Sequence, residues 1–265
     1  MSTDQPAIEA AFTDLRGALM LLTRLPVPLD DAAFAATGPQ GESTRGQGRL
    51  VWAFPLVGAI VALLALLPAG LAAWWGLAPG GVALLVLAGG VLLTGAMHED
   101  GLADLADGFW GGWTRERRLE IMKDSRVGTY GVLALILSLL ARWWALSTIF
   151  AGGAFWAPVL AAAVLSRAAM GVTMASLDHA RADGLGQSFG RTPALPAAGG
   201  LGLAVVLALV VIGWAALPAL IFGAAAALAL ALLAQAKIGG QTGDVLGAQQ
   251  QVTEIAVLMV LASIL

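Results

Sequence analysis

Long apolar segments follow one another along this chain, and short polar connections separate them. A bilayer core of about 30 Å is crossed by about 20 apolar residues of α-helix. The pattern predicts an all-α fold, a polytopic membrane bundle of about six to seven transmembrane helices. We place the spans at 50–70, 80–97, 131–150, 155–176, 199–217 and 219–236, with a shorter apolar segment at 252–265.

The segment before the first span has a different pattern. Residues 7–25, AIEAAFTDLRGALMLLTRL, carry too many charges for a span and are typical of an amphipathic helix lying in the membrane interface. The following LPVP ends this helix, because proline cannot continue one. The start of the chain is acidic where a secretory signal is basic, so we expect no cleaved targeting segment. We therefore expect one membrane domain, 1–265, whose segment 1–49 is cytoplasmic or interfacial.

Composition and charge narrow the classes of function. Hydrophobic residues make up 59% of the chain and charged residues 12%, against about 25% charged in ordinary soluble domains. The absence of cysteine excludes disulfides, thiolate metal sites and a cysteine nucleophile. The formal net charge is −3 and the basic residues form no long run, so nucleic acid is not expected as a partner.

The distribution of Lys and Arg predicts the topology. The connections after the first, third and fifth spans contain neither residue. Eight Lys and Arg lie instead in three polar segments, at 98–130, 178–198 and 237–251. Because basic loops stay in the cytoplasm, we expect the N-terminus and these three segments, the candidate active-site loops, to face the cytosol.

The most unusual stretch is TGAMHEDGLADLADGFWGG, residues 94–112, in which four carboxylates fall within nine residues with no base among them. Asp100, Asp104 and Asp107 have the spacing i, i+4, i+7, which places them on one face of a helix. A divalent cation would offset their repulsion, and oxygen ligands favour Mg²⁺. The alternative is that they mark only the wet end of a span. Glu99 points elsewhere on the helix, as a supporting or surface residue, and His98 suits a hydrogen-bonded structural role better than that of a base.

The next polar stretch, KDSRVGTYG at 123–131, combines charge, a hydroxyl group and glycine. Lys123, Asp124, Ser125 and Arg126 precede two glycines and the third span. Basic groups and free N–H groups near a helix start suit a phosphate. A helix cap with interfacial anchors would explain the same residues.

Three more positions are candidates for the same chemistry. Arg167 lies inside the fourth span, where a buried arginine is usually paired or functional. Gln241 and Asp244 lie in a glycine-rich stretch, where close backbone approach to a ligand and a simple turn are equally good explanations. Asp244 is the best candidate there for a further metal ligand or a general base. Together these groups suit phosphoryl transfer, with an alcohol attacking a metal-bound diphosphate.

Four stretches also resemble the cobalamin synthase family, the adenosylcobinamide-GDP ribazoletransferases. They are LLTRLPVP at 21–28, HEDGLADLADG at 98–108, LEIMKDSRVGTYG at 119–131 and GGQTGDVLGA at 239–248. The resemblance implies that α-ribazole, or its 5′-phosphate, is joined to adenosylcobinamide-GDP with release of GMP, giving adenosylcobalamin or its phosphate. It also implies Mg²⁺ as cofactor, corrinoid and nucleoside substrates, and a place in the inner membrane of a bacterium. A homo-oligomer and contacts with other enzymes of the cobalamin pathway are left open.

The resemblance allows each candidate residue to be given an expected role in metal binding, substrate binding or catalysis. Three aspartates would hold one or two Mg²⁺ ions: Asp100, Asp104 and Asp107. Six residues would bind substrate: Lys123, Asp124, Ser125, Arg126, Arg167 and Gln241. Asp104 would be essential for catalysis, and Asp244 or His98 would take the proton of the ribazole 5′-hydroxyl, with Asp244 preferred.

Two other classes of membrane protein remain as alternatives. A phosphotransferase acting on a CDP-activated lipid shares the chemistry, but its Asp-Gly-x-x-Ala-Arg signature is absent. A cation-coupled transporter is a more distant alternative, because it would place its carboxylates near the bilayer midplane on broken helices.

Overall fold

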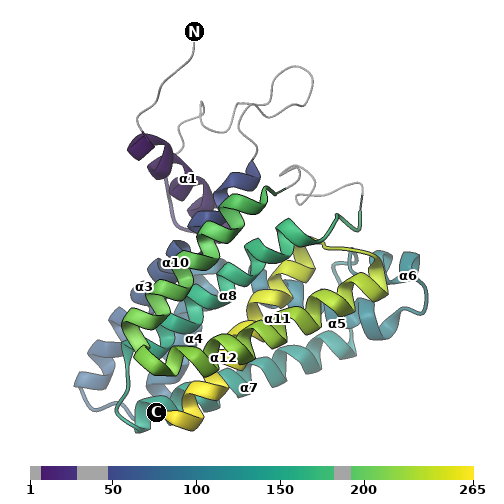
Figure 1. Cartoon of the computed structure of the whole chain (residues 1–265). Helices are drawn as coiled ribbons and strands as arrows, with labels where there is room; N and C mark the ends of the chain where they lie inside the picture. Colours follow the sequence, from purple (N-terminus) through teal and green to yellow (C-terminus); the bar gives the residue numbers. More distant parts are fainter. Residues whose placement is uncertain (1–6, 29–46, 182–191) are drawn as a thin grey trace.

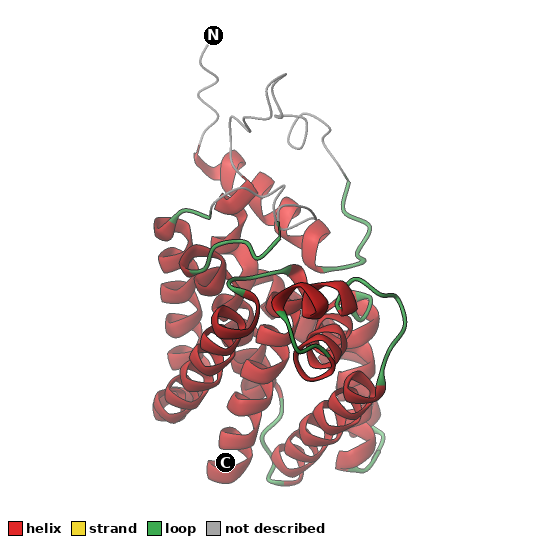
Figure 2. Ribbon diagram, turned by 90° about the vertical axis from the view of Figure 1, so that its right-hand side faces the viewer, coloured by secondary structure: helices red, strands yellow, loops and turns green. Residues whose placement is uncertain are grey.

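The computed structural model describes residues 7–28, 47–181 and 192–265, and these fold almost entirely into α-helices (Figure 1). The helices are α1 (Ala7–Leu22), α3 (Phe54–Trp74), α4 (Pro79–Thr94), α5 (Met97–Gly111), α6 (Arg115–Ile121), α7 (Thr129–Ala151), α8 (Trp156–Ser176), α10 (Ala194–Ile212), α11 (Ala216–Ile238) and α12 (Gly243–Ile264), with 3₁₀ helices η1 (Gln47–Ala53) and η2 (Gly213–Ala215). The described residues contain one isolated β-bridge, between His179 and Gln241. The predicted all-α class is confirmed, and Figure 2 shows the described residues as helices and loops.

Within the described residues, five helical runs have the length and apolar composition needed to cross a bilayer. They are Gly48–Trp74, Thr129–Ala151, Trp156–Ser176, Ala194–Ile238 and Gly243–Ile264. The 45-residue run contains α10 and α11, which change direction at Gly213, where φ is +57° (Figure 1). It is about twice the length of a single span. The chain is therefore a polytopic membrane protein, as predicted.

The predicted span at 80–97 ends three residues early, and a new helix starts beyond it. α5 leaves α4 at an angle of 87°, and only as a bent pair do the two pass as a sixth span. The turn is made by Gly95 and Ala96, whose φ angles are +66° and +59°. The Arg24 side chain packs over Gly95, and the backbone N–H of Arg24 donates to the Leu93 carbonyl at 2.7 Å. α5, with its four carboxylates, thus lies outside the five spanning runs.

Two of the three polar segments are more helical than the sequence suggested. Segment 98–130 contains α5 and α6, and most of 237–251 is the start of α12. The prediction of a short last segment at 252–265 was wrong, because α12 begins at Gly243 and has 22 residues. Its polar start is inside the bundle, where Gln250 and Gln251 are each 1% exposed. The third segment, 178–198, includes residues 182–191, which lie outside the described residues, as do residues 1–6 and 29–46 of the N-terminal segment.

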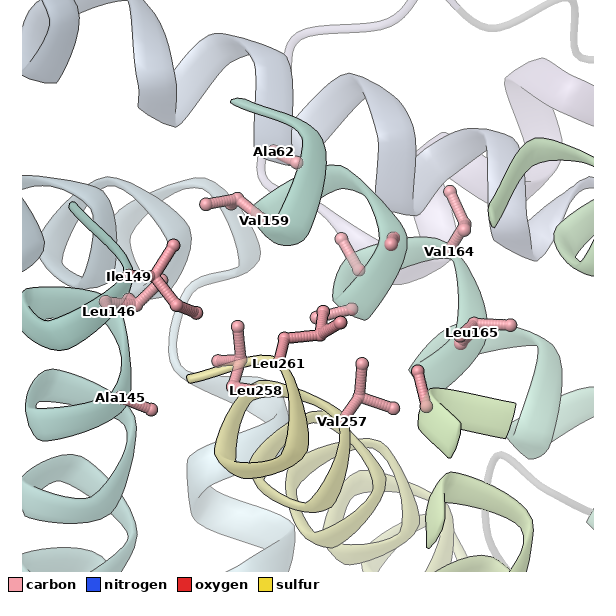
Figure 3. Packing of buried hydrophobic residues seen from close by; sticks show 14 of the residues in the cluster. Ala62, Ala145, Leu146, Ile149, Val159, Val164, Leu165, Val257, Leu258 and Leu261 are labelled. Atoms are coloured by element: carbon pink, nitrogen blue, oxygen red, sulfur yellow. The ribbon is translucent and has the colours of Figure 1, made fainter. Parts of the chain in front are cut away.

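The apolar core lies where α12 passes between α7 and α8. Figure 3 shows Leu258 and Leu261 of α12 between Leu146 and Ile149 of α7 on one side and α8 on the other. All four of these side chains are at most 2% exposed. Alanine is frequent among the other core residues. Small side chains let helices approach closely in a membrane, where van der Waals packing and hydrogen bonds drive association.

α1 forms as predicted and packs on the start of the bundle. Asp14 accepts a hydrogen bond from the Trp52 indole of η1 at 3.0 Å. On its exposed side, Ile8 and Phe12 are 71% and 62% exposed, and their i, i+4 spacing places them on one face. The apolar face expected of an interfacial helix is therefore present.

Candidate active site

The acidic stripe lies on one helix, α5, as its spacing predicted. Its environment changes along the helix: Asp100 is exposed, Asp104 is half-buried, and Asp107 is only 8% exposed. We call Asp100 and Asp104 the acid face. These two carboxylates remain accessible to a ligand, whereas Asp107 is enclosed by protein.

Two glycines bring α12 against α5 next to the acid face. A Cβ atom added at Gly101 would lie 2.9 Å from the carbonyl oxygen of Asp244 and 3.2 Å from Cα of Gly247. One added at Gly247 would lie 3.2 Å from Cα of His98. Neither position has room for a larger residue. This close crossing carries Asp244, predicted from a different motif, to the neighbourhood of Asp104.

The electrostatics of Asp104 follow from this crossing. Burial, followed by the charges of Asp100, Asp244 and Asp107, raises the pKa of the Asp104 carboxyl from 3.8 to about 7, against a smaller opposing effect of Arg181. Four carboxylates thus compete for one region, and a bound cation would relieve their repulsion.

Asp244 is held by two donors, both on its Oδ2 atom. Arg181 donates from Nη2 at 3.3 Å, and the Thr242 hydroxyl donates at 3.2 Å. Arg181 also donates to the Leu119 carbonyl of α6 at 3.3 Å. Oδ1 of Asp244 accepts no hydrogen bond from the described residues, which leaves it for a ligand. The site therefore also uses Arg181, and its position among glycines was the only signal for it in the sequence.

Asp107 has a different set of partners from the acid face. Its two oxygens accept the backbone N–H groups of Gly128 at 2.6 Å and Gly131 at 2.9 Å, at the start of α7. An anion is favourable at a helix N-terminus, where N–H groups lack partners within the helix. No signal in the sequence indicated this contact, because Gly128 and Gly131 are 21 and 24 residues away from Asp107 along the chain.

The predicted phosphate-binding residues form an exposed turn between α6 and α7. Lys123, Ser125 and Arg126 are exposed, and Asp124 is half-buried. Arg126 pairs with Asp124 at 2.6 Å. Its hydrogen bonds lower the pKa of the Asp124 carboxyl from 3.8 to about 2. Since Arg126 is the more exposed partner, it can exchange this surface contact for a stronger anion at little cost.

Arginines of α6 tie the three polar segments together. Arg115 donates to the carbonyls of Ile238 and Ala180, both at 2.7 Å. Arg118 donates to the carbonyl of Lys237 at 3.0 Å. Carbonyls at the end of a helix lack partners within the helix, and arginine satisfies them well. The described parts of the three segments therefore meet at one end of the bundle, as the charge pattern predicted.

Gln241 lies beside the site but is used by the protein itself. Its side-chain amide donates to the carbonyls of Met174 at 3.1 Å and Leu177 at 2.9 Å, and it is 3% exposed. Its backbone pairs with Asp178 and Ala180, each at 2.8 Å. Gln241 thus joins the end of α8 to the start of α12, and its role in substrate binding stays a prediction.

His98 and Arg167 lie in another place, where they line a cavity of about 60 Å³ between the helices that has both apolar and polar walls. Its polar lining comes from five helices: Thr94, His98, Glu99, Arg142, Arg167, Gln250, Gln251 and Glu254. His98 and Arg167 are 1% and 3% exposed. The structure therefore separates these two candidates from the acid face, which favours Asp244 over His98 as the base.

Glu99 is neither a supporting residue of the acid face nor on the surface. Its Oε1 atom accepts bonds from both terminal nitrogens of Arg142 at 3.2 Å and from the Gln251 amide at 3.1 Å. Arg142 also lies 3.6 Å from Glu254. The expectation that arginines inside spans are paired holds for Arg142. For Arg167, the only hydrogen bond within the described chain is one of 3.4 Å to the Ala163 carbonyl.

A divalent cation suits the acid face by chemistry. No three His, Asp or Glu side chains in the described part of the chain converge closely enough to hold an ion alone. Mg²⁺, however, is usually held by one or two carboxylates, with water and substrate phosphates as the other ligands. Asp100 and Asp104, with Asp244 opposite, provide this type of donor set.

Comparisons with known proteins give one consistent result. Residues 14–262 match the family model described as cobalamin-5-phosphate synthase. A relative from Bradyrhizobium diazoefficiens is 43% identical, with 97% of this chain and 95% of the relative aligned. Relatives from Sinorhizobium medicae (44%; 96% and 98% covered) and Chlorobaculum parvum (42%; 92% and 93%) are similar in extent. All three are named adenosylcobinamide-GDP ribazoletransferase. No solved structure matches the chain.

Proposed function

Because the chain belongs to the cobalamin-5-phosphate synthase family, we propose that it is an adenosylcobinamide-GDP ribazoletransferase. It joins α-ribazole, or its 5′-phosphate, to adenosylcobinamide-GDP. The ribazole 5′-oxygen forms a bond to the phosphorus on the cobinamide side, the bond from that phosphorus to the GMP oxygen breaks, and the hydroxyl proton is removed. The products are GMP and adenosylcobalamin or its 5′-phosphate.

The observation that carries this proposal is the crossing of α5 and α12. At this crossing, Asp104 lies among other carboxylates that raise its pKa to about 7. Such crowding costs free energy, and structural needs do not explain it, because acidic faces of ordinary helices interleave Lys or Arg. A diphosphate with its cation would balance these charges.

In this proposal, Asp100 and Asp104 would hold Mg²⁺. Asp107, the third ligand predicted from the motif, already binds two backbone N–H groups with its oxygens. When bound, Mg²⁺ neutralises charge on the diphosphate oxygens and stabilises the leaving phosphate. Lys123 and Arg126, close to the start of α7, add positive charge to the same oxygens.

Asp244 accepts the proton of the ribazole hydroxyl. Its Oδ2 atom accepts hydrogen bonds from Arg181 and Thr242, which supports a role for the other oxygen, Oδ1, toward substrate. A carboxylate with one oxygen held and the other open is well placed as a general base. Proton transfer to Asp244 and loss of GMP complete the exchange without a covalent enzyme intermediate.

We further propose that the protein lies in the inner membrane of a bacterium, with its N-terminus and the three polar segments in the cytosol. The distribution of Lys and Arg supports this orientation. The nucleotide substrate and GMP would then enter and leave from the cytosolic side.

The test is turnover by purified protein in lipid with adenosylcobinamide-GDP and α-ribazole. We expect GMP release that requires both substrates and Mg²⁺, with one ribazole-containing corrinoid formed per GMP. GMP release without α-ribazole would indicate a hydrolase and contradict the transferase. No release by folded protein, together with turnover of a CDP-activated lipid, would replace this proposal with the related lipid phosphotransferase.

A further inference from the structure

The segment between α6 and α7 is attached to α5 at both of its ends. We call residues 123–127 the basic loop. Met122, just before it, is 3% exposed and packs on Gly108, where an added Cβ atom would lie 3.0 Å from the Met122 sulfur. Gly128, just after it, donates to Asp107 at 2.6 Å. The two ends thus meet on consecutive residues of one helix.

Asp107 binds two backbone N–H groups at the start of α7 that are usually bound by two different side chains. Gly128 is the N-cap residue of α7 and offers no side-chain cap, and Gly131 is the third residue of the helix. In a capping box, one side chain binds the N–H of the third residue and another binds that of the N-cap. Here the two oxygens of Asp107, from another helix, bind both N–H groups.

Glycine is required on the other side of this contact. A Cβ atom added at Gly128 would lie 2.5 Å from Oδ1 of Asp107, and one added at Gly131 would lie even closer to Oδ2. The carboxylate is 8% exposed and both oxygens already accept N–H groups, so little of its surface is left for a cation. No backbone N–H group among the described residues donates to the carboxylates of the acid face, which lies earlier on α5.

We propose that Asp107 is a positioning residue, which fixes the basic loop against α5 and so sets the place of Lys123 and Arg126 relative to Asp104. This differs from the metal-ligand role that the motif predicted. The claim about substrate rests on the proposed function, whereas the claim about the contact does not. Because Asp107 and Asp104 are three residues apart, about 4.5 Å along the helix, the two sets of charges would move together.

The first experiment measures the contact without turnover. Lys123 and Arg126 are trypsin sites, so the rate of cleavage after them reports how often the basic loop leaves α5. Asp107→Asn retains only one acceptor oxygen, and Gly131→Ala puts a methyl group where the carboxylate lies. We expect each to raise this rate about tenfold in folded protein, as local opening becomes easier.

Two matched controls separate this effect from a general loss of order. Glu116→Gln removes an exposed carboxylate from α6, and Gly111→Ala adds a methyl group that meets only Ile121, at 3.6 Å. Neither should change cleavage. If Asp107→Asn fails to accumulate, Gly131→Ala carries the test alone. Cleavage at the wild-type rate in a folded variant of either kind would overturn the proposal.

The second experiment separates positioning from metal binding. We expect Asp107→Asn and Gly131→Ala to raise KM for adenosylcobinamide-GDP about tenfold and to leave the half-saturating Mg²⁺ concentration unchanged. The double variant should be no worse than the worse single one, because both remove the same contact. A rise in the Mg²⁺ requirement of Asp107→Asn alone would restore the metal-ligand role. No GMP release by the wild type would count against the proposed function, while the cleavage rates would still decide the contact.

Discussion

Helix α5 carries its acidic side chains into two opposite environments. Glu99 turns into the bundle, where Arg142 and Gln251 bind its Oε1 atom. Asp100 and Asp104 lie near Asp244 of α12, and no ion pair with them forms among the described residues. The two carboxylates at 99 and 100 are neighbours in sequence and about 100° apart around the helix. One group is neutralised by the protein, and the other is left with excess negative charge.

The comparison shows how a fold assigns acidic residues to structure or to a ligand. A carboxylate buried inside a helix bundle must be paired, because an unpaired buried charge costs several kcal/mol. Glu99 meets this requirement with partners from α7 and α12. The acid face lies at the edge of the bundle, where water and a bound cation can offset its charge. Because the acid face has no protein partner among the described residues, a bound cation or a proton is needed to relieve the repulsion between its carboxylates.

The largest effect should come from the unpaired group. Asp104→Asn is expected to lower Mg²⁺-dependent GMP release by at least about 1,000-fold, or ~4 kcal/mol in the barrier, because the amide cannot neutralise a cation. Its thermal stability should be equal to or above that of the wild type, since one repelling charge is removed. Turnover within tenfold of wild type, compared with Glu116→Gln as a control, would contradict the assignment.

The paired group should show the reverse result. Arg142→Met leaves the buried Glu99 and the partly buried Glu254 without their partner, and should lower the free energy of unfolding by about 3 kcal/mol. This would appear as a lower Tm in lipid, with a smaller loss of turnover than in Asp104→Asn. Adding Glu99→Gln should recover part of the stability, because one uncompensated charge is then removed. If Arg142→Met abolishes turnover at unchanged Tm, the group formed by Arg142, Glu99 and Glu254 has a role in catalysis rather than in stability.

A smaller effect should appear with pH. Because the pKa of Asp104 is about 7 and a cation needs the carboxylate form, the half-saturating Mg²⁺ concentration should rise about tenfold from pH 8 to pH 6. The stability of the metal-free protein should change in the opposite direction: Mg²⁺ binding improves as pH rises, whereas the free energy of unfolding decreases. Folded protein keeps the Asp104 proton up to about pH 7, whereas an unfolded chain loses it near 3.8, so stability falls as pH rises through 7.

Asp104→Asn is the control for this pH effect, measured by Tm in metal-free buffer. The variant should lose the decrease in Tm between pH 6 and pH 8. Asp124 cannot cause the effect, because its pKa of about 2 keeps it ionised throughout this range. An unchanged pH dependence of Tm in the variant would assign the titration to another group.

Much of the arrangement could be predicted from local patterns. The apolar runs identified the spans, because their length must match the bilayer. The i, i+4, i+7 spacing placed three aspartates on one helix, and the Lys and Arg distribution grouped the polar segments. Each of these signals lies within a few turns of helix, where geometry is fixed by the backbone alone.

The failures share one cause. α12 starts nine residues before the predicted segment, because its polar residues are buried against partners such as Ser138 and Ser166 on other helices. Hydropathy cannot distinguish a glutamine in water from one bonded inside a bundle. Likewise, α4 ends at a turn made by a glycine and an alanine, and no proline marked that break.

By itself, the sequence determined that this is an all-helical membrane protein with a concentrated acidic motif and the signature of its family. Only the tertiary structure decided which acid does what: Glu99 is paired inside the bundle, Asp107 holds the start of α7, and Asp100 and Asp104 remain open beside Asp244. The physical reason is that spacing along a helix fixes direction, whereas the partner that neutralises a charge comes from a distant part of the chain. Glu99 and Gln251 are 152 residues apart and form one hydrogen bond.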